Sequence, residues 1–291
     1  MPLAWFDGRT VKLIPTLHPA VTFREAYLEG RCRSDWSKIA SEACSDSPPT
    51  LPQRKHTILD TSSTPENQLR TLEDWLRHLQ GDYLMAVDIE TTIPGHRAHP
   101  SIKCIAMSHE PGSSLVVPTM GLAPDSPTIS ILRDVLECWD GARLIFHNGL
   151  YDTYWLSRLW SVRAPAWTLD TLAMHHALDP AEDHDLAYLA SIYIRESYWK
   201  DMPDSGSLDD LHVYCGIDAC VTRELAHIFM DDLELGHRMP FYDQYYGTML
   251  GPLRRLMLTG IKVDDLQRSE IESALLVQAL TTKSTLLGGA P

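Results

Sequence analysis

The hydrophobic pattern of the chain predicts a mixed α/β domain in its middle. Short continuous apolar runs are typical of buried strands, and they occur at 83–90, 103–107, 114–117, 143–146 and 167–170. No predicted helix separates the first three runs, whereas helical segments precede the last two. We therefore expect a mixed five-stranded sheet, with three antiparallel strands and two more added through helical crossovers.

Helical spacing of apolar residues dominates the segments between and after these strands. The expected helices cover 65–79, 126–139, 150–160, 171–178, 185–193, 207–235, 240–258 and 265–287. The resulting fold class is an α/β sheet flanked by helices, with a helical C-terminal extension.

Proline, serine and threonine gather before the first strand of the sheet. They make the range 46–66 a predicted linker. This boundary leaves an N-terminal segment, 1–45, a central domain, 67–237, and a C-terminal helical region, 238–291.

Two carboxylates stand at the carboxyl end of the first predicted strand of the central domain. Asp88 and Glu90 are two positions apart, so their side chains leave the same face of the strand. Paired carboxylates repel one another, and a hard cation such as Mg²⁺ or Mn²⁺ relieves the repulsion. The alternative is a strand that simply ends in a polar loop, because the D-x-E pattern is short.

Two further pairs have helical i,i+4 spacing, so each pair can face one site. Asn148 and Asp152 follow the fourth predicted strand, and Tyr214 and Asp218 lie within the long helical segment. The alternatives are structural. Asn148 can be a helix cap with Asp152 as a first-turn acid, and Tyr214 can be a half-buried tyrosine beside a solvated acid.

In this order, D-x-E, N-x-x-x-D and Y-x-x-x-D resemble the three exonuclease motifs of the DEDD superfamily. The tyrosine places the resemblance in the DEDDy branch. The stretch from Asp170 through Pro180 to Ala190 also resembles the connecting region of proofreading domains in family A DNA polymerases. The resemblance covers roughly 68–235 and implies an RNase H-like (DnaQ-like) fold.

The resemblance also implies site roles. Asp88, Glu90, Asp152 and Asp218 would bind two divalent metal ions, Mg²⁺ or Mn²⁺, and would be catalytic together with Tyr214. Because free tyrosine titrates near 10, Tyr214 is expected to orient the attacking water. Residues that match substrate-binding positions are Thr91 and Asn148.

The implied activity is metal-dependent 3'-5' exonuclease action on the single-stranded 3' end of DNA, releasing nucleoside 5'-monophosphates during proofreading in DNA replication. One alternative is an RNA 3' exonuclease of the RNase D type, since these motifs do not separate the two sugars. Another is an inactive remnant that binds nucleic acid or a polymerase, although all four carboxylates and the tyrosine are present.

The flanking segments carry two further resemblances. The His18-Pro19 motif within 14–21 is similar to the C-terminal motif of uracil-DNA glycosylase-like domains; the alternative is a chance His-Pro turn. We expect no glycosylase activity, because the water-activating motif of such domains is not found in the sequence. The range 241–265 looks like the start of the thumb of family A polymerases.

Together the flanks indicate part of a phage-type fusion of glycosylase-like, exonuclease and polymerase segments. No polymerase catalytic motif is present, so we expect no polymerase activity in this chain. The expected partners of the apolar stripe over 241–287 are a separate polymerase chain or a second copy of the protein.

Charge and cysteine content limit the possible partners and compartment. The net charge of −14 excludes a broad basic surface for duplex DNA, but it leaves open a nuclease whose metal ions neutralise phosphate locally. Six cysteines without a C-x-x-C pair indicate reduced thiols. No apolar run reaches the length of a membrane span, so we expect a cytoplasmic protein.

Overall fold

A computed structural model describes seven stretches of the 291-residue chain: 13–45, 50–60, 63–77, 84–92, 100–138, 143–163 and 168–288. The chain divides into two compact units, Met1–Arg254 and Arg255–Pro291. The sheet and all the predicted site residues belong to the first unit.

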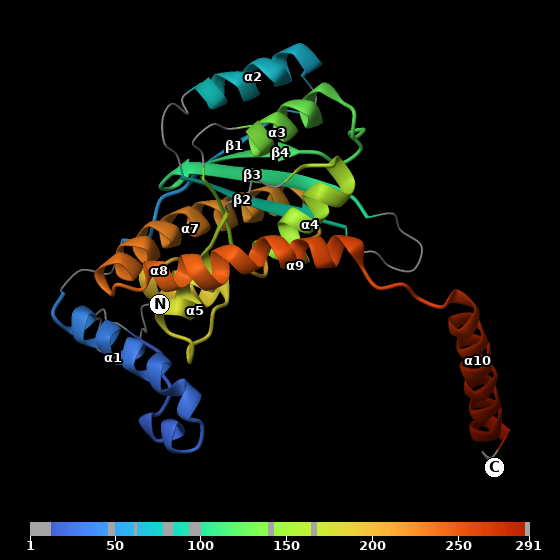
Figure 1. The fold of residues 1–291 in the computed structure, drawn as a ribbon. Helices are drawn as coiled ribbons and strands as arrows, with labels where there is room; N and C mark the ends of the chain where they lie inside the picture. Colours follow the sequence, from blue (N-terminus) through green and yellow to red (C-terminus); the bar gives the residue numbers. More distant parts are fainter. Residues whose placement is uncertain are drawn as a thin grey trace. The chain divides into compact units, whose positions relative to one another are not determined.

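The described residues of the first unit form a six-stranded mixed sheet with the strand order β1-β4-β3-β2-β5-β6 (Figure 1). Its strands are β1 (Lys55–Ile58), β2 (Leu84–Thr91), β3 (Ile102–Glu110), β4 (Ser113–Pro118), β5 (Arg143–Phe146) and β6 (Thr168–Asp170). Strands β2, β3 and β4 form an antiparallel meander, and β5 and β6 run parallel to β2. This arrangement confirms the predicted α/β fold.

Strand β1 is the difference from the expected five-stranded sheet. It lies inside the range predicted to be a linker and pairs in parallel with β4. Its four residues contain no continuous apolar run, so the sequence pattern did not indicate a strand. Long-range contacts hold it instead. Arg54, directly before the strand, contacts Glu196 and Glu224, and the Leu59 amide donates to the carbonyl of Val116 at 2.9 Å.

The helices are α1 (Glu29–Ala43), α2 (Pro65–Arg77), α3 (Pro127–Cys138), α4 (Gly149–Trp160), α5 (Thr171–Leu178), α6 (Leu186–Tyr193), α7 (Leu208–Leu235), α8 (Met239–Tyr242), α9 (Thr248–Thr259) and α10 (Asp265–Gly288). From α2 onward, the helices follow the predicted ranges closely. The helix expected over 240–258 is interrupted, because a π-helical segment, Asp243–Gly247, separates α8 from α9.

Alternating side chains of β2 face two different cores. Met85, Val87 and Ile89 pack in a cluster with residues of α2, α3 and α4, whereas Ala86 packs with residues of α5, α6, α7 and α8. Because side chains alternate along a strand, positions 88 and 90 share the face of Ala86, which is covered by α7.

Small residues allow α7 to lie close against the sheet. The packing between them includes Cys104, Ala106 and Ala219, all fully buried. At Gly216, an added Cβ would lie 2.5 Å from Nδ1 of His56 and 2.9 Å from Oγ of Ser114. Gly216 therefore sets the depth of α7 between the two predicted site positions on this helix, Tyr214 and Asp218.

The N-terminal segment contacts the central domain. His18 caps a short 3₁₀ helix, Pro19–Phe23, through Nδ1, which accepts from the amide of Ala20 at 3.1 Å. In α1, Glu42 pairs with Arg195 at 2.7 Å. These contacts do not test the proposed glycosylase-like origin of 1–45, which stays a prediction.

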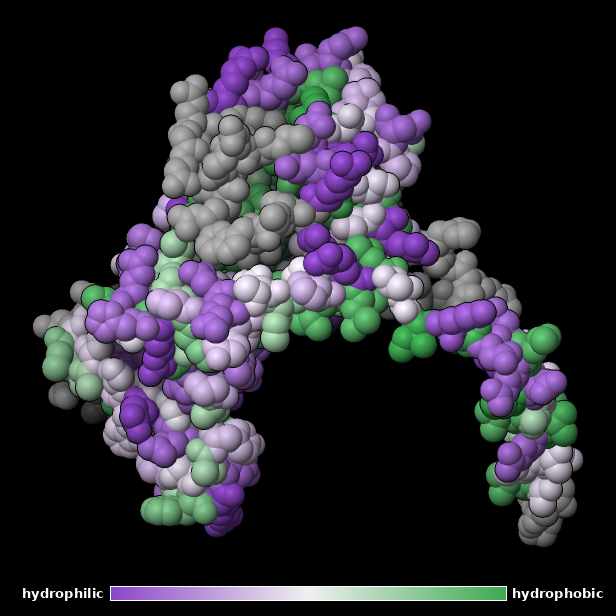
Figure 2. Space-filling model, viewed as in Figure 1, coloured by the Kyte–Doolittle hydropathy of each residue, from purple (hydrophilic) through white to green (hydrophobic). Residues whose placement is uncertain are grey.

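In the second unit, α10 exposes its apolar side chains (Figure 2). Leu266, Ile271, Leu275 and Leu280 are each more than half exposed. Among the described residues, no helix is long and apolar enough to cross a membrane. The resemblance of this region to a polymerase thumb also stays a prediction.

Candidate active site

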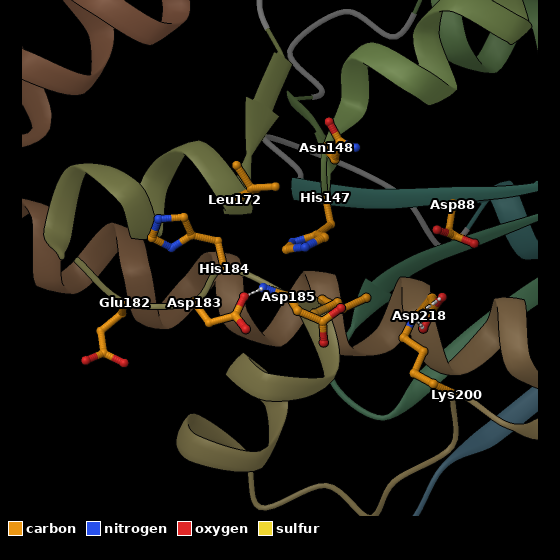
Figure 3. A pocket seen from close by; sticks show the side chains of 11 residues that line it. Asp88, His147, Asn148, Leu172, Glu182, Asp183, His184, Asp185, Lys200 and Asp218 are labelled. Carbon is orange, nitrogen blue, oxygen red and sulfur yellow. Dashed lines mark hydrogen bonds and ion pairs between the residues drawn. The ribbon is translucent and has the colours of Figure 1, made fainter. Parts of the chain in front are cut away.

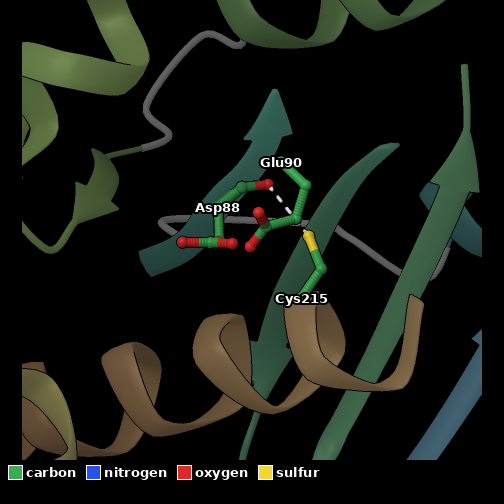
Figure 4. Close-up of side chains that lie close together, drawn as sticks. All are labelled: Asp88, Glu90 and Cys215. Atoms are coloured by element: carbon green, nitrogen blue, oxygen red, sulfur yellow. Dashed lines mark hydrogen bonds between the residues drawn. The ribbon is translucent and has the colours of Figure 1, made fainter. Parts of the chain in front are cut away.

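Strand β2 places Asp88 and Glu90 side by side near the end of the strand (Figure 4). The register between β2 and β3 shifts between Glu90 and Thr91, so the strand pairing becomes irregular directly after the acidic pair. A carboxylate oxygen of each residue lies within 4.8 Å of the other and of Sγ of Cys215. The two carboxylates predicted from the D-x-E pattern therefore form one cluster.

Helix α4 brings Asp152 to the same place. Its Oδ1 accepts from the amide of Ile89 at 3.2 Å, and its side chain is buried, with 5% of the residue exposed. The turn before α4 makes this possible. Asn148 has a positive φ of 62°, and a Cβ at Gly149 would lie 2.5 Å from Cβ of Phe146.

Asp170 holds this turn in place. Its carboxylate accepts from the amides of Asn148 at 3.1 Å and Gly149 at 2.8 Å, and also from the first turn of α5. Asp170 is therefore structural. It lies at the end of β6 and holds the turn from which α4, the helix that carries Asp152, begins.

Helix α7 contributes Asp218, of which 4% is exposed. Its carboxylate accepts from Nε1 of Trp199 at 2.6 Å and from Nζ of Lys200 at 2.8 and 2.9 Å. Lys200 also donates to the hydroxyl of Tyr214 at 3.0 Å. Lys200 was not among the residues predicted from the sequence, although it is the one Lys or Arg between Arg195 and Arg223, within an acidic stretch.

The carboxylates strongly disfavour one another's charge. Burial, followed by the charges of Asp218, Asp152 and Glu90, raises the pKa of Asp88 well above its usual range. Burial and Asp218 raise the pKa of Glu90 to about 7. Burial likewise raises the pKa of Asp152 and of Asp218. Lys200 lowers the pKa of Asp88, Glu90 and Asp218 only in part, so the protein itself compensates the negative charge of the cluster incompletely.

This donor set fits divalent cations. Oδ2 of Asp88 is buried and has no hydrogen-bond partner among the described residues, so an acceptor is available within the cluster. The Cys215 thiol is a weaker candidate ligand, because burial raises its pKa well above the usual range and keeps it protonated. Carboxylate oxygens remain, and these are the ligands that Mg²⁺ and Mn²⁺ prefer.

A cleft of about 530 Å³ opens beside the cluster (Figure 3). Its lining residues are Asp88, His147, Asn148, Leu172, Glu182, Asp183, His184, Asp185, Leu186, Lys200 and Asp218. Asn148 occupies the N-cap position of α4 but makes no side-chain cap bond, and it is exposed. Thr91 is not a lining residue; its Oγ1 lies 2.5 Å from the hydroxyl of Tyr151. Of the two predicted substrate-binding residues, Asn148 alone borders the cleft.

The raised pKa values predict that the metal-free protein loses stability as the pH rises. The pKa of Glu90 is about 7 in the folded chain, against a usual 4.5, so between these values the folded chain binds more protons than the unfolded chain. The free energy of unfolding then falls with rising pH, for Glu90 alone by about 2–3 kcal/mol.

Thermal unfolding in EDTA, from about pH 5 to pH 8, measures this effect. Mn²⁺ should raise the Tm more at the higher pH, because the ion replaces protons in the cluster. A Tm that is independent of pH in EDTA would contradict the electrostatic description of the site.

Comparison with known proteins identifies the family. A model of the 3'-5' exonuclease family matches residues 65–234, more than half of the chain. The chain belongs to the 3'-5' exonuclease family. A comparison with curated protein sequences gives no match.

Solved structures of other nucleases share the fold of this exonuclease. Brucella melitensis NrnC bound to pGG is 20% identical with a TM-score of 0.54, and the match covers 72% of this chain and 95% of that one. NrnC with bound Mg²⁺ is 17% identical with a TM-score of 0.51, over 72% and 95% of the two chains. Escherichia coli RNase D, an exoribonuclease involved in structured RNA processing, is 14% identical with a TM-score of 0.55, over 69% and 51%. At these identities the likeness concerns the fold alone.

Proposed function

We propose that this exonuclease removes nucleotides from the 3' end of single-stranded DNA, with two divalent ions held by Asp88, Glu90, Asp152 and Asp218. One observation carries the proposal. Four carboxylates come together from β2, α4 and α7. Asp152 and Asp218 are buried, Asp88 and Glu90 are half-buried, and the charges of the other three raise the pKa of Asp88. Such a concentration of buried like charge is costly without a counter-ion.

Two bound divalent ions would supply an activated water and stabilise the leaving 3' oxygen. The protein's own part is to hold these oxygens and to position the water. Burial and then Asp218 raise the pKa of Tyr214 above its usual value, so its hydroxyl stays protonated at neutral pH. Tyr214 is therefore proposed to orient the water by hydrogen bonding, while the proton of the water goes elsewhere.

The size and charge of the cleft support a single-stranded substrate. About 530 Å³ suits a ligand of one or two nucleotides, and the lining carboxylates would repel a long run of phosphates. Asn148 borders this cleft and is proposed to contact the terminal nucleotide. Thr91 is proposed to act from the end of β2, through its neighbour Tyr151.

DNA proofreading rests on the resemblance of the flanks to glycosylase-like and polymerase segments. The second candidate is RNA 3' trimming, which is favoured by the fold shared with RNase D, an exoribonuclease. The proposed partner of the apolar side chains of α10 is a polymerase chain or a second copy of the protein. Their exposure supports association with either one, since exposed apolar surface favours association.

Matched DNA and RNA oligonucleotides labelled at the 5' end test the function. With Mg²⁺ or Mn²⁺ we expect stepwise shortening of the DNA, release of nucleoside 5'-monophosphates and no shortening in EDTA. An oligonucleotide whose 3' end is blocked by an inverted nucleotide is the control and should stay intact. Faster shortening of RNA would select the second candidate, and no shortening of either by the folded protein would contradict both.

A further inference from the structure

Lys200 is the basic group in contact with the acidic cluster. Its Nζ lies 2.8 and 2.9 Å from the two carboxylate oxygens of Asp218 and 3.0 Å from the hydroxyl of Tyr214. The ammonium also lies over the rings of Tyr214 and Trp199, at 4.7 and 5.2 Å from their centroids. The side chain is 21% exposed, so it is held mainly by these contacts while its charge still borders the cleft.

The lining of the cleft gives Lys200 a second possible partner. Among the lining residues it is the one Lys or Arg, whereas five are carboxylates (Figure 3). The imidazole of His147 adds no charge near neutral pH, because burial lowers its pKa to about 4. A phosphate that enters the cleft therefore meets one permanent positive charge of the protein, the ammonium of Lys200.

In the free protein Lys200 is paired with Asp218, a carboxylate that a metal ion would also bind. The ammonium engages both oxygens of Asp218, so a divalent ion that binds this carboxylate must displace it or share it. A lysine is suited to such a change of partner, since its flexible stem carries three donors that can be redirected. Tyr214 gives the ammonium a contact that does not depend on Asp218.

We propose that Lys200 is a positioning residue that changes partner during substrate binding: it neutralises Asp218 in the free protein and contacts a phosphate of the terminal nucleotides in the complex. The proposal rests on the exonuclease function proposed above. Lys200 then has opposite effects on two ligands. Its ammonium competes with the metal ion for Asp218, and the same ammonium attracts the nucleic acid.

The variant Lys200→Met separates these effects. Without nucleic acid, Mn²⁺ should bind several-fold more tightly than to the wild type, by titration calorimetry. In Ca²⁺, a fluorescent single-stranded DNA with phosphorothioate linkages at its 3' end should bind about 10-fold more weakly, as expected for the loss of one charge-assisted contact. The slope of log K against log salt should fall by about 0.7, the loss of one phosphate contact on a single strand.

The matched control is Lys103→Met, which removes a charge that acts on Glu90 but lines no part of the cleft. It should leave the salt slope for DNA unchanged. Lys200→Arg, which keeps the charge, should keep the wild-type slope. If Lys200→Met does not fold, Lys200→Gln takes its place in the same measurements.

Two results would overturn the proposal. One is a wild-type DNA affinity and salt slope in the Met variant. The other is weaker binding of both Mn²⁺ and DNA, which a merely structural lysine would produce. A wild-type protein that neither binds nor shortens the oligonucleotide would instead overturn the proposed function itself, so the two failures are distinct.

Discussion

The double variant Asp88→Asn with Glu90→Gln is expected to lose at least about 10³-fold in the rate of 3' end shortening, equivalent to ~4 kcal/mol of transition-state stabilisation. Both side chains keep their shape and lose the charge that would bind the metal ions. Because the carboxylates repel one another in the folded chain, the same variant should be more stable than the wild type in EDTA at about pH 8. Rates from the oligonucleotide assay and Tm values measure the two effects.

The opposite directions of these effects separate loss of chemistry from loss of folding. The matched control is Glu73→Gln with Asp74→Asn in α2, where both side chains are about half exposed. This control makes the same chemical change away from the cluster and should alter neither the rate nor the pH dependence of stability. Wild-type shortening by the Asp88 and Glu90 variant would show that the site has been placed wrongly.

The variant Arg54→Met is expected to lower the free energy of unfolding by about 3–5 kcal/mol, since it leaves buried carboxylates without a counter-ion. Arg54 lies 2.6 Å from Glu196 and 2.8 Å from Glu224, and its side chain is only 6% exposed. Glu224 also accepts from the amide of Gly112 at 2.9 Å, in the turn between β3 and β4. The loss should therefore loosen β1 and the β3–β4 turn from α7. Denaturant unfolding measures it.

Adding Glu196→Gln and Glu224→Gln to Arg54→Met should recover most of the lost stability, because no buried charge is then left unpaired. The control is Arg77→Met in α2, whose side chain is 69% exposed and pairs with Asp74 at 2.9 Å. An exposed pair of this kind contributes about 1 kcal/mol or less. Equal losses in the two single variants would mean that β1 is not anchored through Arg54.

Local patterns accounted for the elements around the site. The apolar run of β2 ends in Asp88 and Glu90, and the period of two along a strand places both side chains on one face. The i,i+4 spacings of Asn148 with Asp152 and of Tyr214 with Asp218 depend on helix geometry in the same way. Each of these relations involves residues close in sequence, so it is determined before the chain folds as a whole.

Other features depend on contacts between distant segments. Strand β1 exists because backbone groups of 55–58 pair with β4 and because Arg54 reaches carboxylates more than 140 residues away. The side chain of Asn148 could have capped α4, yet Asp170 supports the turn and leaves that side chain to the cleft. Lys200 lies before α7 in the chain yet contacts Asp218 and Tyr214 within this helix, a relation that sequence spacing did not suggest.

Periodicity and motif spacing are local properties, and they predicted the strands from β2 onward, most of the helices, and the four carboxylates and the tyrosine of the proposed site. The tertiary structure alone decided that the sheet has a sixth strand, that Asp152 lies against the backbone of β2, and that a lysine neutralises Asp218. The physical reason is that a buried charge is tolerated only beside a partner. Here these partners are distant in sequence, so the folded structure and not the local pattern brings them together.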